Sequence, residues 1–200
     1  MSLFACTRSK TKDDKSARNV QLEKRIRESP KENIELNNLN ITDDDVTYII
    51  NKVIKKNKRC QSLSLTNNEI TSNGIQILID SLVKNSKITH LNLSSNPLGD
   101  QAIQFISQLI MSNRTLYHLS LADTNITDIG FRELIQTLSS NSSPLRTLDL
   151  RSNKSITDAS IPFLIQMVDR NQTLSACRLD NCQLTEQGFN QLKEEKSIKW

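Results

Sequence analysis

Apolar residues return along this chain in one phrase that repeats every 28 or 29 residues. The second leucine of the phrase gives the clearest column: Leu36, Leu65, Leu93, Leu121, Leu150 and Leu179. Another apolar residue lies two positions earlier in each copy: Ile34, Leu63, Leu91, Leu119, Leu148 and Cys177. Further apolar columns lie five positions before this leucine, from the second copy on, and five or six positions after it. Such columns, in register over nearly six copies, predict an internal repeat.

Each copy of the repeat has two parts with different periods. The Leu-x-Leu stretch alternates apolar and polar residues, which predicts a strand. The part that follows has helical spacing, as in Ile75, Leu78, Ile79 and Leu82. A Thr followed by an acid, such as Thr127 and Asp128, precedes most of these helices. The Thr can cap free N–H groups and the acid favours the positive end of the helix dipole. Pro162 falls in the first turn of the fifth helix, where it is tolerated.

One strand and one helix cannot bury their own apolar faces, whereas stacked copies can. Strands then pair in parallel at about 4.8 Å, while the wider helices lie side by side on the outer face. This mismatch bends the stack into an arc. The sequence therefore predicts an α/β solenoid with a parallel sheet on the concave face and helices on the convex face.

The phrase LxxLxLxxNxLxxxGxxxLxxxL over residues 31–196 resembles the leucine-rich repeats of the ribonuclease-inhibitor type. The resemblance implies a short horseshoe of about six repeats. It also implies that an inward Asn satisfies backbone groups in the turn after each strand, at Asn68, Asn96 and Asn153. Cys182 is a family alternative in that column, whereas Leu39 and Thr124 depart from it. We therefore expect the first turn to be less regular.

Composition adds a division of the chain into two segments. The whole chain of 200 residues has a net charge of +4. Residues 1–31 hold nine Lys and Arg against four acids, so they carry 9 − 4 = +5 and the remainder −1. We expect residues 1–30 to form a basic segment, disordered or partly helical, and residues 31–200 to form the repeat domain. The mixed acids disfavour nucleic acid as a partner of the basic segment.

The two ends of the stack need covers, because a solenoid exposes apolar faces there. A short helix over residues 16–29, with Val20, Leu22 and Ile26 partly apolar, could cover the first copy. Ile198 and Trp200 follow a shortened last helix and could cover the other end. Self-association through the repeat ends, or a longer array, stays open.

The repeat accounts for the positions of the cysteines and of the N-x-S/T triplets. Cys60 and Cys177 occupy apolar columns, so we expect them in the core, although spacing alone leaves open a bridge between Cys177 and Cys182. Triplets of the N-x-S/T type are expected to be a by-product of the repeat and occur at Asn40, Asn92, Asn113, Asn125, Asn141, Asn153 and Asn171. The start of the chain has no apolar run typical of a signal peptide, and no segment is long enough to span a membrane. A cytoplasmic protein is therefore expected.

The residues that alternate with the leucines should line the concave face. His90 and His118 fall in one column, where two exposed imidazoles are favoured over a metal pair because no third ligand is evident. Asp149 and Arg178 share a column, as do Arg151 and Asp180, which predicts a small charge lattice. That lattice either neutralises itself or recognises a partner. The candidate binding residues are Ser64, Thr66, His90, Asn92, His118, Ser120, Asp149, Arg151, Arg178 and Asp180.

The sequence thus favours a non-catalytic protein-binding module that uses its concave face, with a protein of unknown identity as partner. No set of nucleophile, base and acid is apparent, no phosphate-binding loop is present, and no cofactor or metal is expected. The resemblance leaves a second function open. Repeats of this type occur in activators of a GTPase, in ribonuclease inhibitors and in actin caps of the tropomodulin kind, so the chain could regulate a partner enzyme or a cytoskeletal protein.

Overall fold

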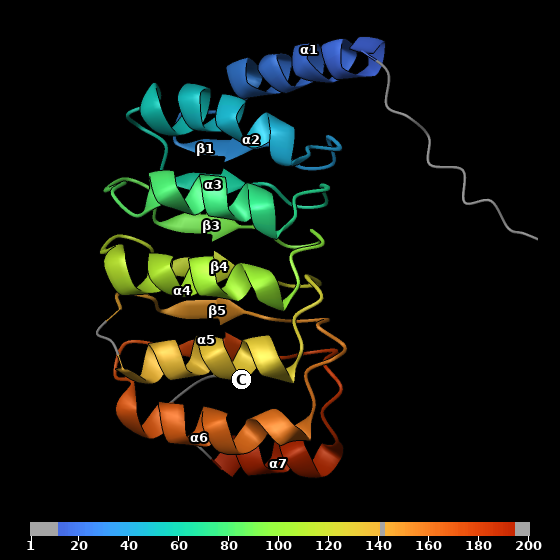
Figure 1. Ribbon diagram of the computed structural model, residues 1–200. Coiled ribbons are helices and arrows are strands. Elements are labelled where there is room, and N and C mark those ends of the chain that lie inside the picture. Colours follow the sequence, from blue (N-terminus) through green and yellow to red (C-terminus); the bar gives the residue numbers. More distant parts are fainter. Residues whose placement is uncertain (1–11, 141–142, 195–200) are drawn as a thin grey trace, which may run out of the picture.

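The computed structural model describes residues 12–140 and 143–194. Within them, six short strands form one parallel sheet in chain order, each paired with the next (Figure 1). The strands are β1 (Asn33–Glu35), β2 (Ser62–Ser64), β3 (His90–Asn92), β4 (His118–Ser120), β5 (Thr147–Asp149) and β6 (Ala176–Arg178). The predicted columns stay in register, because Leu63 pairs with Leu91 and Leu119 pairs with Leu148. The α/β solenoid expected from the sequence is confirmed.

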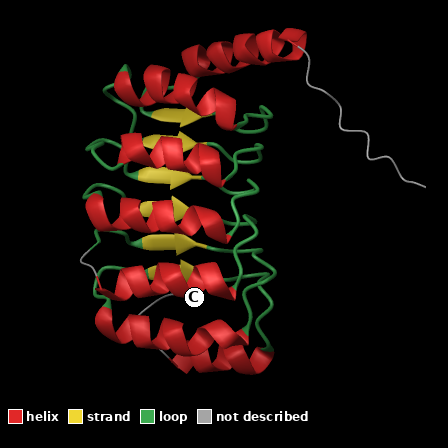
Figure 2. Cartoon of the chain, viewed as in Figure 1, coloured by secondary structure: helices red, strands yellow, loops and turns green. Residues whose placement is uncertain are grey.

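The helices after β1 lie on one side of the sheet, as Figure 2 shows. The helices are α1 (Lys12–Glu28), α2 (Asp43–Ile49), α3 (Ser72–Leu82), α4 (Ile103–Ser112), α5 (Asp128–Ser140), α6 (Ile161–Arg170) and α7 (Glu186–Glu194). The first repeat helix continues from α2 into π-helical turns over Ile50–Lys55, and short 3-10 turns lead into α4 and α6. None of the described helices is long and apolar enough to cross a membrane.

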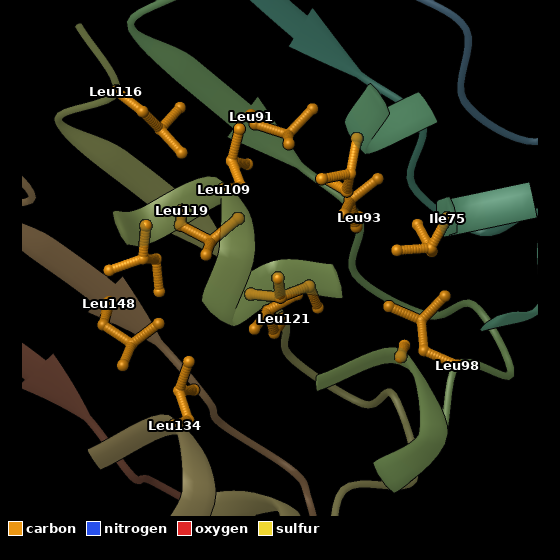
Figure 3. Packing of buried hydrophobic residues seen from close by; sticks show 14 of the residues in the cluster. Ile75, Leu91, Leu93, Leu98, Leu109, Leu116, Leu119, Leu121, Leu134 and Leu148 are labelled. Carbon is orange, nitrogen blue, oxygen red and sulfur yellow. The ribbon is translucent and has the colours of Figure 1, made fainter. Parts of the chain in front are cut away.

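The leucine columns form the core between the sheet and the helices (Figure 3). Leu93, Leu121 and Leu150 lie after neighbouring strands and are 0% exposed. Each such side chain contributes about 1.5–3 kcal/mol through burial. The side chains on α3, α4 and α5 that have helical spacing close the other side of this core, as Ile75, Leu109 and Leu134 do in Figure 3. Packing between successive copies therefore stabilises strands that are only three residues long.

A buried asparagine stabilises the turn after the strand. Asn153 Nδ2 donates to the carbonyls of Leu121 and Leu150, both at 2.8 Å. Its Oδ1 accepts the backbone N–H groups of Thr124 and Ile126, both at 3.0 Å. One side chain thus bonds four buried backbone groups, and the two N–H groups among them have it as their acceptor.

The same bonding recurs at Asn68 and Asn96, as the resemblance implied. Where the column departs from Asn, smaller substitutes occur. Thr124 donates its hydroxyl to the Leu121 carbonyl at 2.7 Å, and the Cys182 thiol donates to the Leu150 carbonyl at 3.3 Å. Leu39 offers no polar atom there, and its N–H is instead satisfied by Asn68 of the next copy at 3.0 Å.

A left-handed residue precedes the asparagine column in every copy. The residues with positive φ at this position are Asn38, Asn67, Ser95, Asp123, Ser152 and Asn181. Residues with short polar side chains tolerate this conformation better than others do, because they can hydrogen-bond locally. This requirement, together with the buried column, explains why Asn and Ser are so frequent in the repeat.

Aspartates at the helix starts join successive repeats on the side where the strands end. Asp100 accepts the backbone N–H of Thr127 at 2.8 Å and the Thr127 hydroxyl at 2.6 Å. We call this pair of bonds the Asp–Thr clamp, and it is formed by Asp43 with Thr71, Asp100 with Thr127, Asp128 with Thr157, and Asp158 with Thr185. The sequence interpretation assigned the acid only to the dipole of its own helix. The structure adds a bond to the next repeat.

A small residue lies beside each described clamp. A Cβ added at Gly130 would lie 2.3 Å from the carboxylate of Asp100, and Gly74 and Gly188 stand equally close to their aspartates. Ser160 occupies the same place beside Asp128 and donates its hydroxyl to that carboxylate. The described junctions thus pack a small residue against each clamp.

The first end of the stack is covered by α1, which lies across it in Figure 1. Leu22 is fully buried and Ile26 packs against the core, as the apolar pattern suggested. Val20 is 67% exposed, so its expected contribution to this cover is wrong, because the helix turns that side chain away from the sheet. Ile198 and Trp200 lie outside the described residues. The division of the chain at residue 30 stays a prediction.

The described cysteines are free thiols. Cys60 and Cys177 are buried and Cys182 is partly buried, so no bridge joins Cys177 and Cys182. Burial raises the pKa of Cys177 to about 12 and that of Cys60 to about 11. Thiols with such a pKa are weak nucleophiles at neutral pH, which agrees with a packing role.

Candidate functional site

The sheet surface opposite the helices is hollowed into a groove of about 560 Å³. The groove is lined by Glu35, Asn37, Ser62, Ser64, His90, Leu91, Asn92, His118, Leu119, Ser120, Thr147, Asp149 and Arg178. Most of these alternate with the buried leucines, as the strand period required. Thr66, Arg151 and Asp180 follow the ends of β2, β5 and β6 and are not among the lining residues.

The two histidines meet in the centre of the groove. The His90 and His118 rings stack with centroids 4.2 Å apart and an interplanar angle of 18°. The Thr89 hydroxyl lies 2.8 Å from His90 Nδ1. Partial burial lowers the pKa of His118, and the positive charges of His90, Arg146 and Arg178 lower it further. Among the described residues no three metal-ligating side chains come together, and the imidazoles lie side by side on the surface.

Asp149 pairs along its own strand, not across the sheet. Arg151 donates Nε to Asp149 Oδ1 at 2.9 Å and Nη2 to Oδ2 at 2.7 Å, a bidentate pair. Burial raises the pKa of Asp149, but the hydrogen bonds and the charge of Arg151 outweigh it, so that pKa lies below its ordinary value. The register does place Asp149 beside Arg178. The two residues thus lie side by side as predicted, and Arg178 acts on Asp149 through its charge, but within the described part of the chain the ion pair of Asp149 is with Arg151.

This pairing leaves Arg178 exposed at the charged end of the groove. In a cross-strand ion pair the opposite charges of Asp149 and Arg178 would offset each other, but Asp149 is already paired with Arg151. Arg178 therefore presents its guanidinium to the groove, where it can donate to a carboxylate. Asp180 is exposed after β6 and acts on Arg151 only through its charge.

The first half of the groove is held by neutral hydrogen bonds. Asn37 Oδ1 accepts the Ser64 hydroxyl at 2.6 Å and the Thr66 backbone N–H at 3.0 Å. The hydroxyls of Ser94 and Ser120 lie 2.7 Å apart. Of these, Asn37 and Ser94 were not among the candidate binding residues. Their position in the strand alternation was the available signal.

Arg146 and Tyr117 flank the groove and were missed by the sequence reasoning. The Arg146 guanidinium lies over the Tyr117 ring, 5.3 Å from its centroid. Both residues come just before strands, outside the alternation that selected the candidates. A periodic pattern within strands gives no signal for such neighbours.

The family model of the MHP1/HER1/GIP3 LRR domain matches residues 7–196. The chain belongs to this leucine-rich repeat family. The match spans α1 as well as all six strands, so the family domain includes most of the basic segment. A comparison with curated proteins found no match.

Solved structures with the same fold include domains of leiomodin-1 and tropomodulin. The structure titled leiomodin-1 actin-binding site 2 is similar with a TM-score of 0.61 and 19% identity, over 94% of this chain and 98% of that one. The C-terminal domain of tropomodulin from Caenorhabditis elegans is similar with a TM-score of 0.62 and 14% identity, over 76% of this chain and 90% of that one. At these identities the likeness shows the fold that the family shares.

A chain of the yeast Rad7–Elc1 complex is also similar. Its TM-score is 0.52 with 22% identity, over 76% of this chain and 36% of that one. The present chain is thus comparable in extent to the leiomodin and tropomodulin domains and shorter than the yeast chain.

Proposed function

We propose that the chain is a non-catalytic protein-binding module that holds a partner protein in its concave groove. The observation that carries this proposal is the exposed Arg178 beside the neutralised pair of Asp149 and Arg151. The polar groove residues alternate with the buried leucines, so their variety is not explained by the apolar core. The stacked imidazoles and Arg178 give the second half of the groove donors, while the first half offers hydroxyls and amides.

The printed names of the similar structures support a protein partner. One is an actin-binding site and another belongs to a complex of two proteins. A groove of about 560 Å³ admits a few side chains of a partner, not a whole domain. We therefore expect a protruding loop or helix end as the bound element, with a carboxylate at Arg178.

The proposal is tested by affinity capture with the full chain. The groove variant combines His118→Ala with Arg178→Glu, and the control combines Gln76→Ala with Lys193→Glu, both exposed positions outside the groove. We expect the wild type and the control to recover the same partner, and the groove variant to bind that partner at least about tenfold more weakly. Recovery of the same partners by all three proteins would place binding elsewhere.

A second candidate function is regulation of a cytoskeletal protein or of a partner enzyme. The similarity to leiomodin-1 and tropomodulin favours the cytoskeletal version. Co-sedimentation with actin filaments tests it directly. Loss of this binding in the groove variant supports the cytoskeletal version. If the wild-type chain stays in the supernatant at filament concentrations of tens of micromolar, about the weak limit for such contacts, the cytoskeletal version is rejected.

A further inference from the structure

A second charged surface lies away from the groove, where helices end and strands begin. The end of the first repeat helix and the loops before β2 and β3 carry six exposed cations: Lys55, Lys56, Lys58, Arg59, Lys84 and Lys87. We call this surface the basic edge. It belongs to the repeat body and not to the basic N-terminal segment, so the segment's charge does not account for it.

Helix capping explains only part of the basic edge. Cations near a helix C-terminus complement the helix dipole, and Lys55 stands in such a last turn. Lys58 and Lys87 lie beyond the helix ends, next to the strand starts, where the dipole effect has faded. Of these six cations, Arg59 forms an ion pair, with Glu32, and the other five form none with the described residues. The remaining charge is therefore not used by the fold.

The two loops are held rigidly, as a binding surface requires. Asn85 Oδ1 accepts the backbone N–H groups of Lys87 and Ile88, both at 2.8 Å. Asn57 Oδ1 does the same for Arg59 at 3.1 Å. Backbone bonds from the second loop to the Gln61 carbonyl lock the loops together. Cations placed on fixed backbone lose less entropy when a ligand binds.

A depression of about 430 Å³ lies between these loops. Lys58, Arg59 and Lys87 line it together with neutral hydrogen-bonding groups from Gln61, Ser86 and Thr89. Glu32 also lines it, and its carboxylate is paired with Arg59, so Lys58 and Lys87 are the lining cations without a recorded ion pair among the described residues. The mixture suits a ligand that has both carboxylates and N–H donors.

We propose that the basic edge binds an acidic segment of a protein. A polypeptide supplies carboxylates for Lys58 and Lys87 and backbone N–H groups for the neutral lining groups, whereas a phosphodiester chain has no N–H donor on its backbone. Single-stranded nucleic acid also needs aromatic faces for stacking. The described loops that lead into β2, β3 and β4 contain one aromatic ring, that of Tyr117, and the Arg146 guanidinium lies over it.

The test measures binding of a labelled oligoglutamate of about ten residues to the full chain in about 50 mM salt, where screening is weak. The variant combines Lys58→Glu with Lys87→Glu. Its control, Lys154→Glu with Lys193→Glu, changes the net charge equally at exposed positions away from the basic edge. We expect at least about a tenfold loss of peptide affinity in the variant and less than about a twofold loss in the control.

Thymidine oligonucleotides and a DNA duplex of matched charge complete the experiment. Weaker binding of both nucleic acids than of the peptide supports the proposal. Equal losses in the variant and the control would show that only net charge matters and would overturn it. Tighter binding of either nucleic acid, lost in the same variant, would overturn it in favour of a nucleic-acid surface.

Discussion

The two loop edges of the solenoid carry opposite charges for different reasons. Where strands end and helices begin, aspartates such as Asp100 and Asp128 accept two hydrogen bonds each from a threonine of the next repeat. On the other edge, Lys58 and Lys87 extend from the loops into solvent. The acids hold the repeats together, while the cations have no comparable role in the fold.

This difference teaches that a repeat separates structural from free charge by position. A charge that meets the next copy at a fixed place becomes part of the junction. A charge that points outward from a loop is available to a ligand. Substitutions on the strand-exit edge should therefore change stability, and substitutions on the basic edge should change binding.

The largest effect is expected at Asn153, on the strand-exit edge. Asn153→Ala leaves the buried N–H groups of Thr124 and Ile126 without an acceptor, at about 1–2 kcal/mol each, and removes one donor from each of two carbonyls, at about 0.5 kcal/mol each. The free energy of unfolding should therefore fall by about 3–5 kcal/mol. Cys182→Ala, at the same place in the last copy, removes one weak thiol bond and should cost about 1 kcal/mol. Urea unfolding followed by circular dichroism compares them. Equal losses would contradict the assigned role of the asparagine.

Removal of one clamp comes next. Asp100→Ala deletes two charge-assisted bonds to Thr127 and should lower the free energy of unfolding by about 2–3 kcal/mol. Asp80→Ala, on the exposed surface of α3, should cost less than about 0.5 kcal/mol. Thermal unfolding of both variants beside the wild type gives the difference. A neutral Asp100 variant would mean that the junction packs without its clamp.

Acid should weaken the clamp at Asp128. Burial raises the pKa of Asp128, but bonds from Ser160 and Thr157 together with Arg132 outweigh it and hold that pKa below its ordinary value. The folded pKa is thus below the unfolded one, so this stabilisation is present above the unfolded pKa of about 3.9 and is lost as pH falls through the folded pKa. From about pH 7 to about pH 2, the free energy of unfolding should depend less on pH in Asp128→Asn than in the wild type. Parallel curves would contradict the assignment.

The smallest change in stability is expected on the basic edge. Lys58→Glu with Lys87→Glu should alter the free energy of unfolding by less than about 0.5 kcal/mol, because surface charges away from specific contacts contribute little. Thermal unfolding measures this beside the peptide titration. A loss as large as that of Asp100→Ala would show that the cations stabilise the fold after all.

Much of the candidate site followed from the strand period. Because side chains alternate across a strand, the columns around Leu91 and Leu119 placed His90 and His118 on one surface. The period says nothing of rotamers. That the rings stack, and that Arg151 turns back onto Asp149, depends on how each side chain meets its neighbours.

The sequence by itself determined the repeat, its strand and helix halves and the buried leucine columns, because these depend on spacing. The asparagine turns followed from the family resemblance. Only the tertiary structure decided the partners of each polar group. The Asp–Thr clamps, the unpaired Arg178 and the basic edge arise between copies about 28 residues apart, at distances of a few ångströms. A linear pattern gives the order of the repeats, but hydrogen bonds of that length depend on how the copies stack in space.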